Sequence, residues 1–190
     1  MIHKTYKNID KFSSQDLVEC VNNAACGNAT HIRINENIAS RAFEDNINLE
    51  SVEIGPNVTE ISGRAFLNCV NLKSVSIGTG VKEIKPNAFD NCTSLESINI
   101  PDNVEKIHRY AFVRCSSLRS INIPAGVQVH NTAFNDKVPI KNDILSKLGN
   151  DVQGESGFKF SNAITIRSTT TAATTAATTA ATTAATTAAT

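Results

Sequence analysis

Short stretches in which polar and apolar side chains alternate recur along the middle of the chain. Each begins with a serine, continues with a branched apolar residue and a polar residue, and ends with isoleucine. Alternation with a period of two is the pattern of a β-strand with one buried face. Residues that favour turns follow each stretch. The pattern therefore predicts four short strands, at 51–54, 74–77, 97–100 and 120–123.

An Ala-Phe pair also returns along the chain, with successive spacings of 23, 23, 23 and 22 residues, at 42–43, 65–66, 88–89, 111–112 and 133–134. In one unit, Ala65, Phe66, Cys69 and Leu72 fall at offsets of zero, one, four and seven, which places them on one face of a helix. Pro86, just before the next pair, suits the first turn of a helix. We therefore expect a short helix with an inward apolar face in each unit.

The constant period of 23 residues is the mark of a solenoid. A single unit of this length cannot bury its own apolar face, whereas stacked units cover one another and form a continuous core. A second small apolar pair follows each strand, as in Val58 with Ile61 and Val81 with Ile84. The pattern predicts an α/β solenoid of about four strand-turn-helix units, with partial units at its ends.

The units resemble the BspA-type leucine-rich repeat, and the third unit, AFDNCTSLESINIPDNVEKI, matches its pattern nearly throughout. The resemblance covers residues 31–136. The chain departs from it with Lys85 and His108 where glycine is common, and with Asn46 where later units have Cys69, Cys92 and Cys115. The resemblance implies a right-handed stack that binds proteins or cell surfaces, and it implies no catalytic residue.

The segments on either side of the repeats differ from them in pattern. Residues 1–30 are predicted to form a helical N-terminal cap, with Ser13 as N-cap and Gly27 as the stop. Residues 137–167 are predicted to form a C-terminal cap, with a short helix at 142–149 and a strand in which Phe158, Phe160, Ile164 and Ile166 alternate. Residues 168–190 contain only Ser, Thr and Ala, so we expect a disordered low-complexity tail, either an inert spacer or a glycosylated stalk.

Charge and hydropathy limit the classes of partner. The chain has 18 basic and 18 acidic side chains, which argues against a nucleic-acid partner. No apolar run approaches the length of a transmembrane segment, and residues 1–16 lack the apolar core of a secretory signal. The sequence therefore favours a cytoplasmic monomer, with a surface location as the alternative.

The cysteines are interpreted as packing residues. Cys69, Cys92 and Cys115 occupy one inward column, and a straight ladder does not supply the tetrahedral geometry of a zinc site. Cys20 and Cys26 are expected to be free, reduced thiols in the cap. His108 is expected to point away from Cys115, so the two do not form a nucleophile–base pair. We expect no enzyme activity, metal or cofactor.

The outward face of the predicted sheet and the last full unit are the candidate binding residues. The face is small and polar, and the last unit gathers a histidine, a tyrosine and three arginines. These residues are Ser74, Ser76, Ser97, Asn99, Ser120 and Asn122 on the face, and His108, Arg109, Tyr110, Arg114 and Arg119 in the last unit. They favour a non-enzymatic module that binds a protein or another macromolecule, and the alternative is an adhesin-like surface protein with a Thr/Ala-rich stalk.

Overall fold

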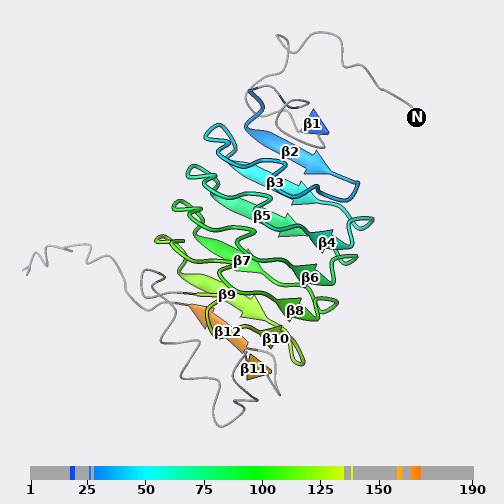
Figure 1. Ribbon diagram of the computed structural model, residues 1–190, viewed down its shortest axis with the longest axis vertical. Helices are drawn as coiled ribbons and strands as arrows, with labels where there is room; N and C mark the ends of the chain where they lie inside the picture. Colours follow the sequence, from blue (N-terminus) through cyan, green and yellow to red (C-terminus); the bar gives the residue numbers. More distant parts are fainter. Residues whose placement is uncertain are drawn as a thin grey trace, which may run out of the picture.

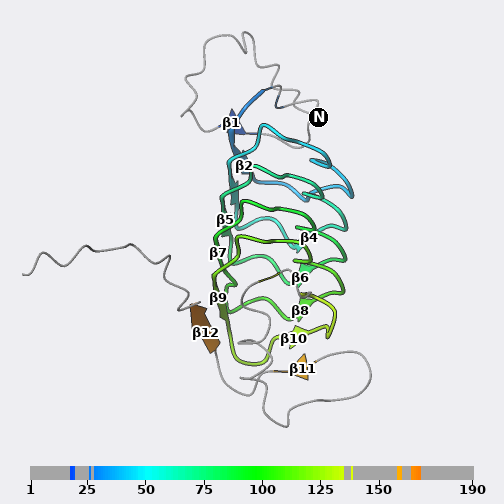
Figure 2. The ribbon, with the colours of Figure 1, turned by 90° about the vertical axis from the view of Figure 1, so that its left-hand side faces the viewer.

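The chain folds into a stack of similar turns with one parallel sheet along its back and a second along its front (Figures 1 and 2). This computed structural model describes residues 26, 28–134 and 138, together with the backbone of strands at 18–19, 158–159 and 164–167. In the repeats the chain passes from one sheet to the other in every unit. The predicted parallel solenoid of about four turns is confirmed.

Sheet A, the larger sheet, is built from the predicted alternating strands. It has seven strands in the order β1-β2-β3-β5-β7-β9-β12. All neighbours are parallel except β12, which is antiparallel to β9. The strands are β1 (Val18–Glu19), β2 (His31–Ile34), β3 (Ser51–Ile54), β5 (Ser74–Ile77), β7 (Ser97–Asn99), β9 (Ser120–Ile123) and β12 (Ile164–Arg167).

Sheet B forms where the second small apolar pair recurs in each unit. It has five strands in the order β11-β10-β8-β6-β4, with β11 antiparallel to β10. Each strand is two residues long, and in the four repeat strands the second residue is buried. The strands are β4 (Glu60–Ile61), β6 (Glu83–Ile84), β8 (Lys106–Ile107), β10 (Gln128–Val129) and β11 (Phe158–Lys159).

The helix predicted around each Ala-Phe pair is wrong, because no helix occurs within 28–134 and the pair lies in successive turns. Around each of the first four pairs, two residues have left-handed backbone angles, such as Arg64 (φ 60°) and Asn68 (φ 62°), which interrupt a right-handed helix. Alternate amides also bond to the next unit: Phe66 N–H donates to Ala88 O at 2.9 Å and Asn68 N–H to Asp90 O at 2.9 Å. A helix would use these amides internally.

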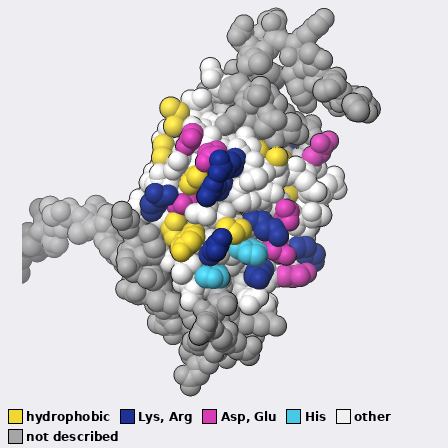
Figure 3. Space-filling model, viewed as in Figure 1, with side chains coloured by type: hydrophobic (Ala, Val, Ile, Leu, Met, Phe, Trp, Pro, Cys, Tyr) yellow, Lys and Arg dark blue, Asp and Glu magenta, His cyan; other side chains and the backbone are white. Residues whose placement is uncertain are grey.

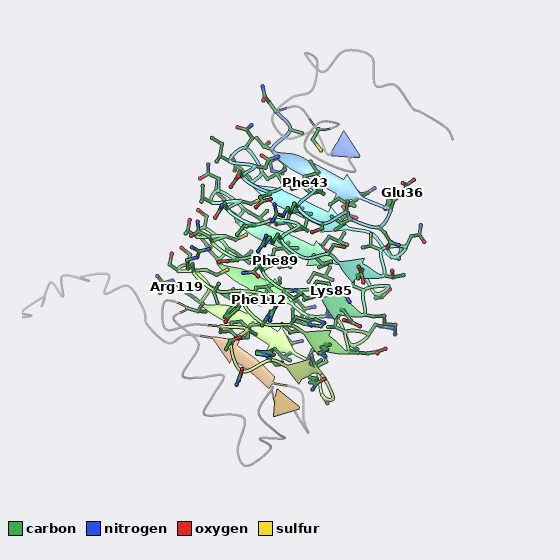
Figure 4. The ribbon with its side chains drawn as sticks, viewed as in Figure 1. Glu36, Phe43, Lys85, Phe89, Phe112 and Arg119 are labelled. Carbon is green, nitrogen blue, oxygen red and sulfur yellow. The ribbon has the colours of Figure 1, made fainter. Side chains whose placement is uncertain are left out.

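The rise between units explains why turns replace helices. The rings of Phe43, Phe66, Phe89, Phe112 and Phe134 stack in one column with centroids 5.2–5.4 Å apart (Figure 4). Neighbouring β-strands lie about 4.7–4.9 Å apart, whereas packed helices need about 8–10 Å. Units bonded through both sheets therefore leave no room for a helix in each repeat.

The cysteine column is buried and free, as predicted for Cys69, Cys92 and Cys115. Each thiol donates to a phenylalanine carbonyl of the unit before it: Cys69 Sγ lies 3.1 Å from Phe43 O, and Cys115 Sγ lies 3.1 Å from Phe89 O. In the first unit Asn46 takes this place, and its Oδ1 accepts from the amides of Asn48 and Leu49. Burial raises the pKa of Cys69 and of Cys115 to about 12.

Cys92→Ser is expected to lower the free energy of unfolding by about 1–3 kcal/mol, because the more polar hydroxyl must enter a fully buried apolar position. Chemical denaturation of the parent and the variant measures this change. In the native parent, the thiols of the cysteine column should also react slowly with a thiol reagent at mildly alkaline pH. The thiolate is the reactive form, and burial keeps these thiols protonated. Rapid labelling of the native ladder would contradict the burial of the column.

The ends of the stack differ in part from the prediction. Val18–Glu19, within the predicted cap helix, is strand β1 and extends sheet A, so the helical cap is not supported there. Cys26 has helical backbone geometry and is disulfide-bonded, which corrects its assignment as a free thiol. After the repeats, the single predicted strand is replaced by two separate strands, β11 in sheet B and β12 in sheet A, each antiparallel to the last repeat strand of its sheet. The rest of both caps, including the helix at 142–149, and the tail at 168–190 lie outside the described residues.

Candidate binding surface

Sheet A presents two outward columns of small polar side chains, which we call the serine face. The strand register aligns Ser51, Ser74, Ser97 and Ser120 in one column, and Glu53, Ser76, Asn99 and Asn122 in the other. The central residues Ser74, Ser76, Ser97 and Asn99 are exposed, while Val52, Val75, Ile98 and Ile121 between them are buried. The alternation that predicted the strands thus produces a regular hydrogen-bonding surface.

On strands β2 to β9, charge on the serine face lies at the end formed by β2 and β3. Arg33 and Glu53 form an exposed salt bridge at 2.8 Å, on β2 and β3. Farther along, Asn122 Nδ2 donates to Asn99 Oδ1 at 3.0 Å, which links β9 to β7. These hydroxyl and amide groups can donate to and accept from a partner, but they do not supply acid–base chemistry.

The candidate residues of the last unit do not form one cluster with the serine face. His108, Arg109 and Tyr110 follow β8 in the front layer, whereas the serine face is the exposed surface of sheet A in the back layer. Figure 2 shows the two sheets on opposite sides of the stack. Arg119 lies immediately before β9. Figure 4 shows it on the other side of the stack from Lys85, which follows β6. One flat partner therefore cannot contact all of the predicted residues at once.

Arg114 is held in an internal ion pair. Its Nε and Nη2 donate to the two carboxylate oxygens of Asp90 at 2.9 and 2.8 Å. Asp90 is buried, with 6% of its side chain exposed, and also accepts from Asn87 Nδ2 at 3.0 Å. The bidentate geometry raises the pKa of Arg114 and gives it a structural role, since its best donors are already used.

A second polar network lies on the front, around sheet B. Glu83 Oε2 lies 2.6 Å from His108 Nε2 and 2.9 Å from Lys85 Nζ, and Lys85 also reaches Glu60 at 3.3 Å. The hydrogen bonds from His108 and Lys85 lower the pKa of Glu83, and the bond to Glu83 raises the pKa of Lys85. This face was not predicted from the sequence, although polar residues flank Ile61, Ile84 and Ile107 in their units.

The described residues do not assemble a reactive site. Among them there is no group of three or more His, Cys, Asp or Glu that could hold a metal ion. Cys115 Sγ points to a core carbonyl and His108 to Glu83, as the predicted divergence of the two side chains requires. Within the same residues no helix has the length and apolarity to cross a membrane.

A repeating parallel stack with a phenylalanine column and an inward cysteine column defines a leucine-rich-repeat solenoid. The chain belongs to the BspA-type leucine-rich-repeat family, whose model matches six copies over residues 19–141. No curated protein matches the chain.

Two solved structures are similar to this chain. One is a leucine-rich-repeat protein of T. pallidum, with 23% identity and a TM-score of 0.52 over 60% of this chain and 55% of that one. The other is a leucine rich cell surface protein of Faecalibacterium prausnitzii A2-165, with 28% identity and a TM-score of 0.52 over 62% of this chain and 28% of that one. The matched region is thus about half of the first structure's length and about a quarter of the second's.

Proposed function

We propose that this chain is a non-enzymatic interaction module that binds another protein through the serine face of sheet A. The exposure of Ser74, Ser76, Ser97 and Asn99 in strict register carries the proposal. Small side chains let a partner approach the sheet closely, and each offers a hydrogen bond at the spacing of the strands. Membership of a leucine-rich-repeat family supports a role in binding.

The chemistry of the serine face predicts modest affinity. On strands β2 to β9 it lacks the tryptophan, tyrosine and arginine residues that dominate strong interfaces, apart from Arg33 at one end and Arg119 at the margin. Beyond β9, Arg167 on β12 pairs in register with Ser120. Specificity then depends on the residues that break the repeat, namely the Arg33–Glu53 pair and the Asn99–Asn122 pair.

Bulky charged substitutions on the serine face should weaken partner binding at least about tenfold. Ser76→Arg and Asn99→Arg place long side chains where the partner must lie closest, and steric and desolvation costs of this size are usual at the centre of an interface. The measurement is a pull-down from the native source, with the tail present and absent, followed by titration of the captured partner. Tyr110→Ala, on the opposite layer, is the control, and folded serine-face variants that bind like the parent would refute the proposal.

A second function, display at a cell surface, is favoured by the disulfide at Cys26. Disulfides persist in oxidising compartments and are rare in reducing ones. The similar Faecalibacterium prausnitzii structure is described as a cell surface protein. In this reading the Thr/Ala-rich segment at 168–190 is a stalk and the repeats are the exposed head. Mass spectrometry of the native protein tests it, since reduced Cys26 and an absence of glycan mass would both count against display.

A further inference from the structure

We propose that the C-terminal end of sheet B binds an acidic, carboxylate-rich segment of another protein. The site is formed by Lys106, His108, Arg109 and His130, which we call the basic end. The proposal rests on the proposed function only in treating the chain as a protein-binding module, because the basic end lies on the opposite layer from the serine face. Figure 3 shows the histidine side chains together with Lys and Arg side chains on this front face.

The register of sheet B brings these groups together. One outward column runs through Glu60, Glu83, Lys106 and Gln128, which pair in register from β4 to β10. The neighbouring column runs through Ser62, Lys85, His108 and His130. The backbone amides of Lys85, His108 and His130 each donate, at 2.9 Å, to the carbonyl of the isoleucine in the preceding unit. The face therefore changes from acidic at its first units to basic at its last.

The two permanent cations of the basic end, Lys106 and Arg109, are not neutralised by a salt bridge within the described part of the chain. The acidic side chains of the first units are already occupied, because Glu60 and Glu83 bind Lys85, and Glu83 also binds His108. Glu105 is paired with Lys82 at 3.4 Å. Lys106 and Arg109 form no salt bridge among the described residues. Two permanent positive charges are thus left exposed or half-exposed beside two histidines.

His130 lies in the positive electrostatic field of the other three residues of the basic end. Its Nδ1 accepts from the Thr132 amide at 3.1 Å, which leaves Nε2 to carry the proton of the neutral ring. Burial and the positive charges of Arg109, His108 and Lys106 lower its pKa. Lys159 on β11 lies in register with Gln128 on the next strand. An acidic segment would offset these repulsions and favour the charged imidazolium, although the protonated Nδ1 no longer accepts from the Thr132 amide.

The ligand chemistry follows from the number and spread of the charges. Sulfated glycans and nucleic acids select dense cationic surfaces, and this chain has no net charge. The basic end instead offers two permanent cations and two titratable ones, interleaved with Glu83. A short run of aspartate or glutamate matches this arrangement, since each carboxylate can accept from a lysine, an arginine or an imidazole.

The test is the binding of a fluorescent oligoglutamate peptide to the full chain at low ionic strength, with an oligoserine peptide as reference. Saturable binding of the acidic peptide alone is expected, and it should strengthen about fivefold when His130, whose pKa is lowered in the free protein, gains a proton as the solution is acidified. Proton uptake and binding are linked, so the affinity must rise as the pH falls.

Matched variants locate the site. Arg109→Glu should weaken peptide binding at least about tenfold, because one attraction is replaced by a repulsion. Lys73→Glu makes the same change of charge at the start of β5, on the margin away from the basic end, and should alter the affinity less than about twofold. His130→Asn keeps an acceptor for the Thr132 amide and should remove part of the pH dependence.

Several outcomes would overturn the proposal. These are equal binding of oligoserine and oligoglutamate, equal losses for Arg109→Glu and Lys73→Glu, tighter competitive binding of a sulfated polysaccharide, or self-association that occupies the site. Ser76→Arg and Asn99→Arg should keep oligoglutamate binding. The failure of the serine face and the failure of the basic end are therefore separate results.

Discussion

Phe89→Ala is expected to lower the free energy of unfolding by about 3–5 kcal/mol, the usual cost of removing a buried aromatic ring. Phe89 is completely buried and stacks between Phe66 and Phe112 at 5.2 and 5.4 Å, so the cavity opens in the middle of the column. Whole domains have stabilities of only about 5–15 kcal/mol. Each unit is covered only by its neighbours, so the halves on either side should also unfold less cooperatively.

Urea unfolding of the parent and of Phe89→Ala measures both effects, as a lower midpoint and as a shallower or two-step transition. Ile47→Ala is the matched control, because 59% of Ile47 is exposed and its truncation should change stability by less than about 0.5 kcal/mol. Similar small losses for the two variants would show that the phenylalanine column is not the main source of stability.

Arg114→Met should destabilise the fold by about 3 kcal/mol, near the lower end of the range for breaking a buried ion pair. The variant leaves the Asp90 carboxylate buried, with Asn87 as its remaining side-chain partner. The cost is at the lower end because 46% of the Arg114 side chain is exposed, and water can replace part of the lost interaction. Equilibrium denaturation measures the change.

The double variant Asp90→Leu/Arg114→Met separates loss of the pair from loss of packing. Asp90 shares its column with Leu67 and Val113, so leucine suits the position. Replacing both members of a buried pair with apolar residues is often neutral. The double variant should therefore recover most of the stability. A double variant no more stable than Arg114→Met would mean that the buried carboxylate is not the source of the loss.

The strands of sheet A and the inward columns could be predicted from the sequence, because a constant period brings identical positions into register. Ser74 aligns with Ser97, and Cys69 with Cys92, without any knowledge of distances. The short helix could not be excluded in this way. Offsets of zero, one, four and seven fit a helix face, but the same four residues are also buried when the segment forms successive turns.

The residues with positive φ explain why the turns around the Ala-Phe pairs were not predicted from the sequence. One column contains Asp45, Asn68 and Asn91, and these residue types adopt positive φ more readily than most others. Arg114 in that column, and Arg41, Arg64 and Tyr110 in the other, carry no such signal, so Asn87 alone shows it in the second column. Sheet B was also missed, since strands of two residues are too short for alternation to be recognised.

The candidate site could be predicted only in part, because closeness in sequence did not mean a shared surface. His108 and Arg119 are eleven residues apart, yet the chain between them leaves the front layer and reaches the margin of the back layer. His130 comes from the following unit and joins His108 through the column register. A partner surface in a solenoid is therefore found by aligning units rather than by grouping neighbours.

The absence of helices within 28–134 determines the curvature of the stack. A solenoid bends when one side is thicker than the other, as when helices line one side and strands the other. Here both sides are sheets whose parallel strands are hydrogen-bonded between units, so both advance by the spacing of neighbouring strands, about 4.7–4.9 Å. The axis is accordingly close to straight in Figure 1, and added units would lengthen it without bending it. Such a molecule presents a flat surface and lacks the hollow of a horseshoe.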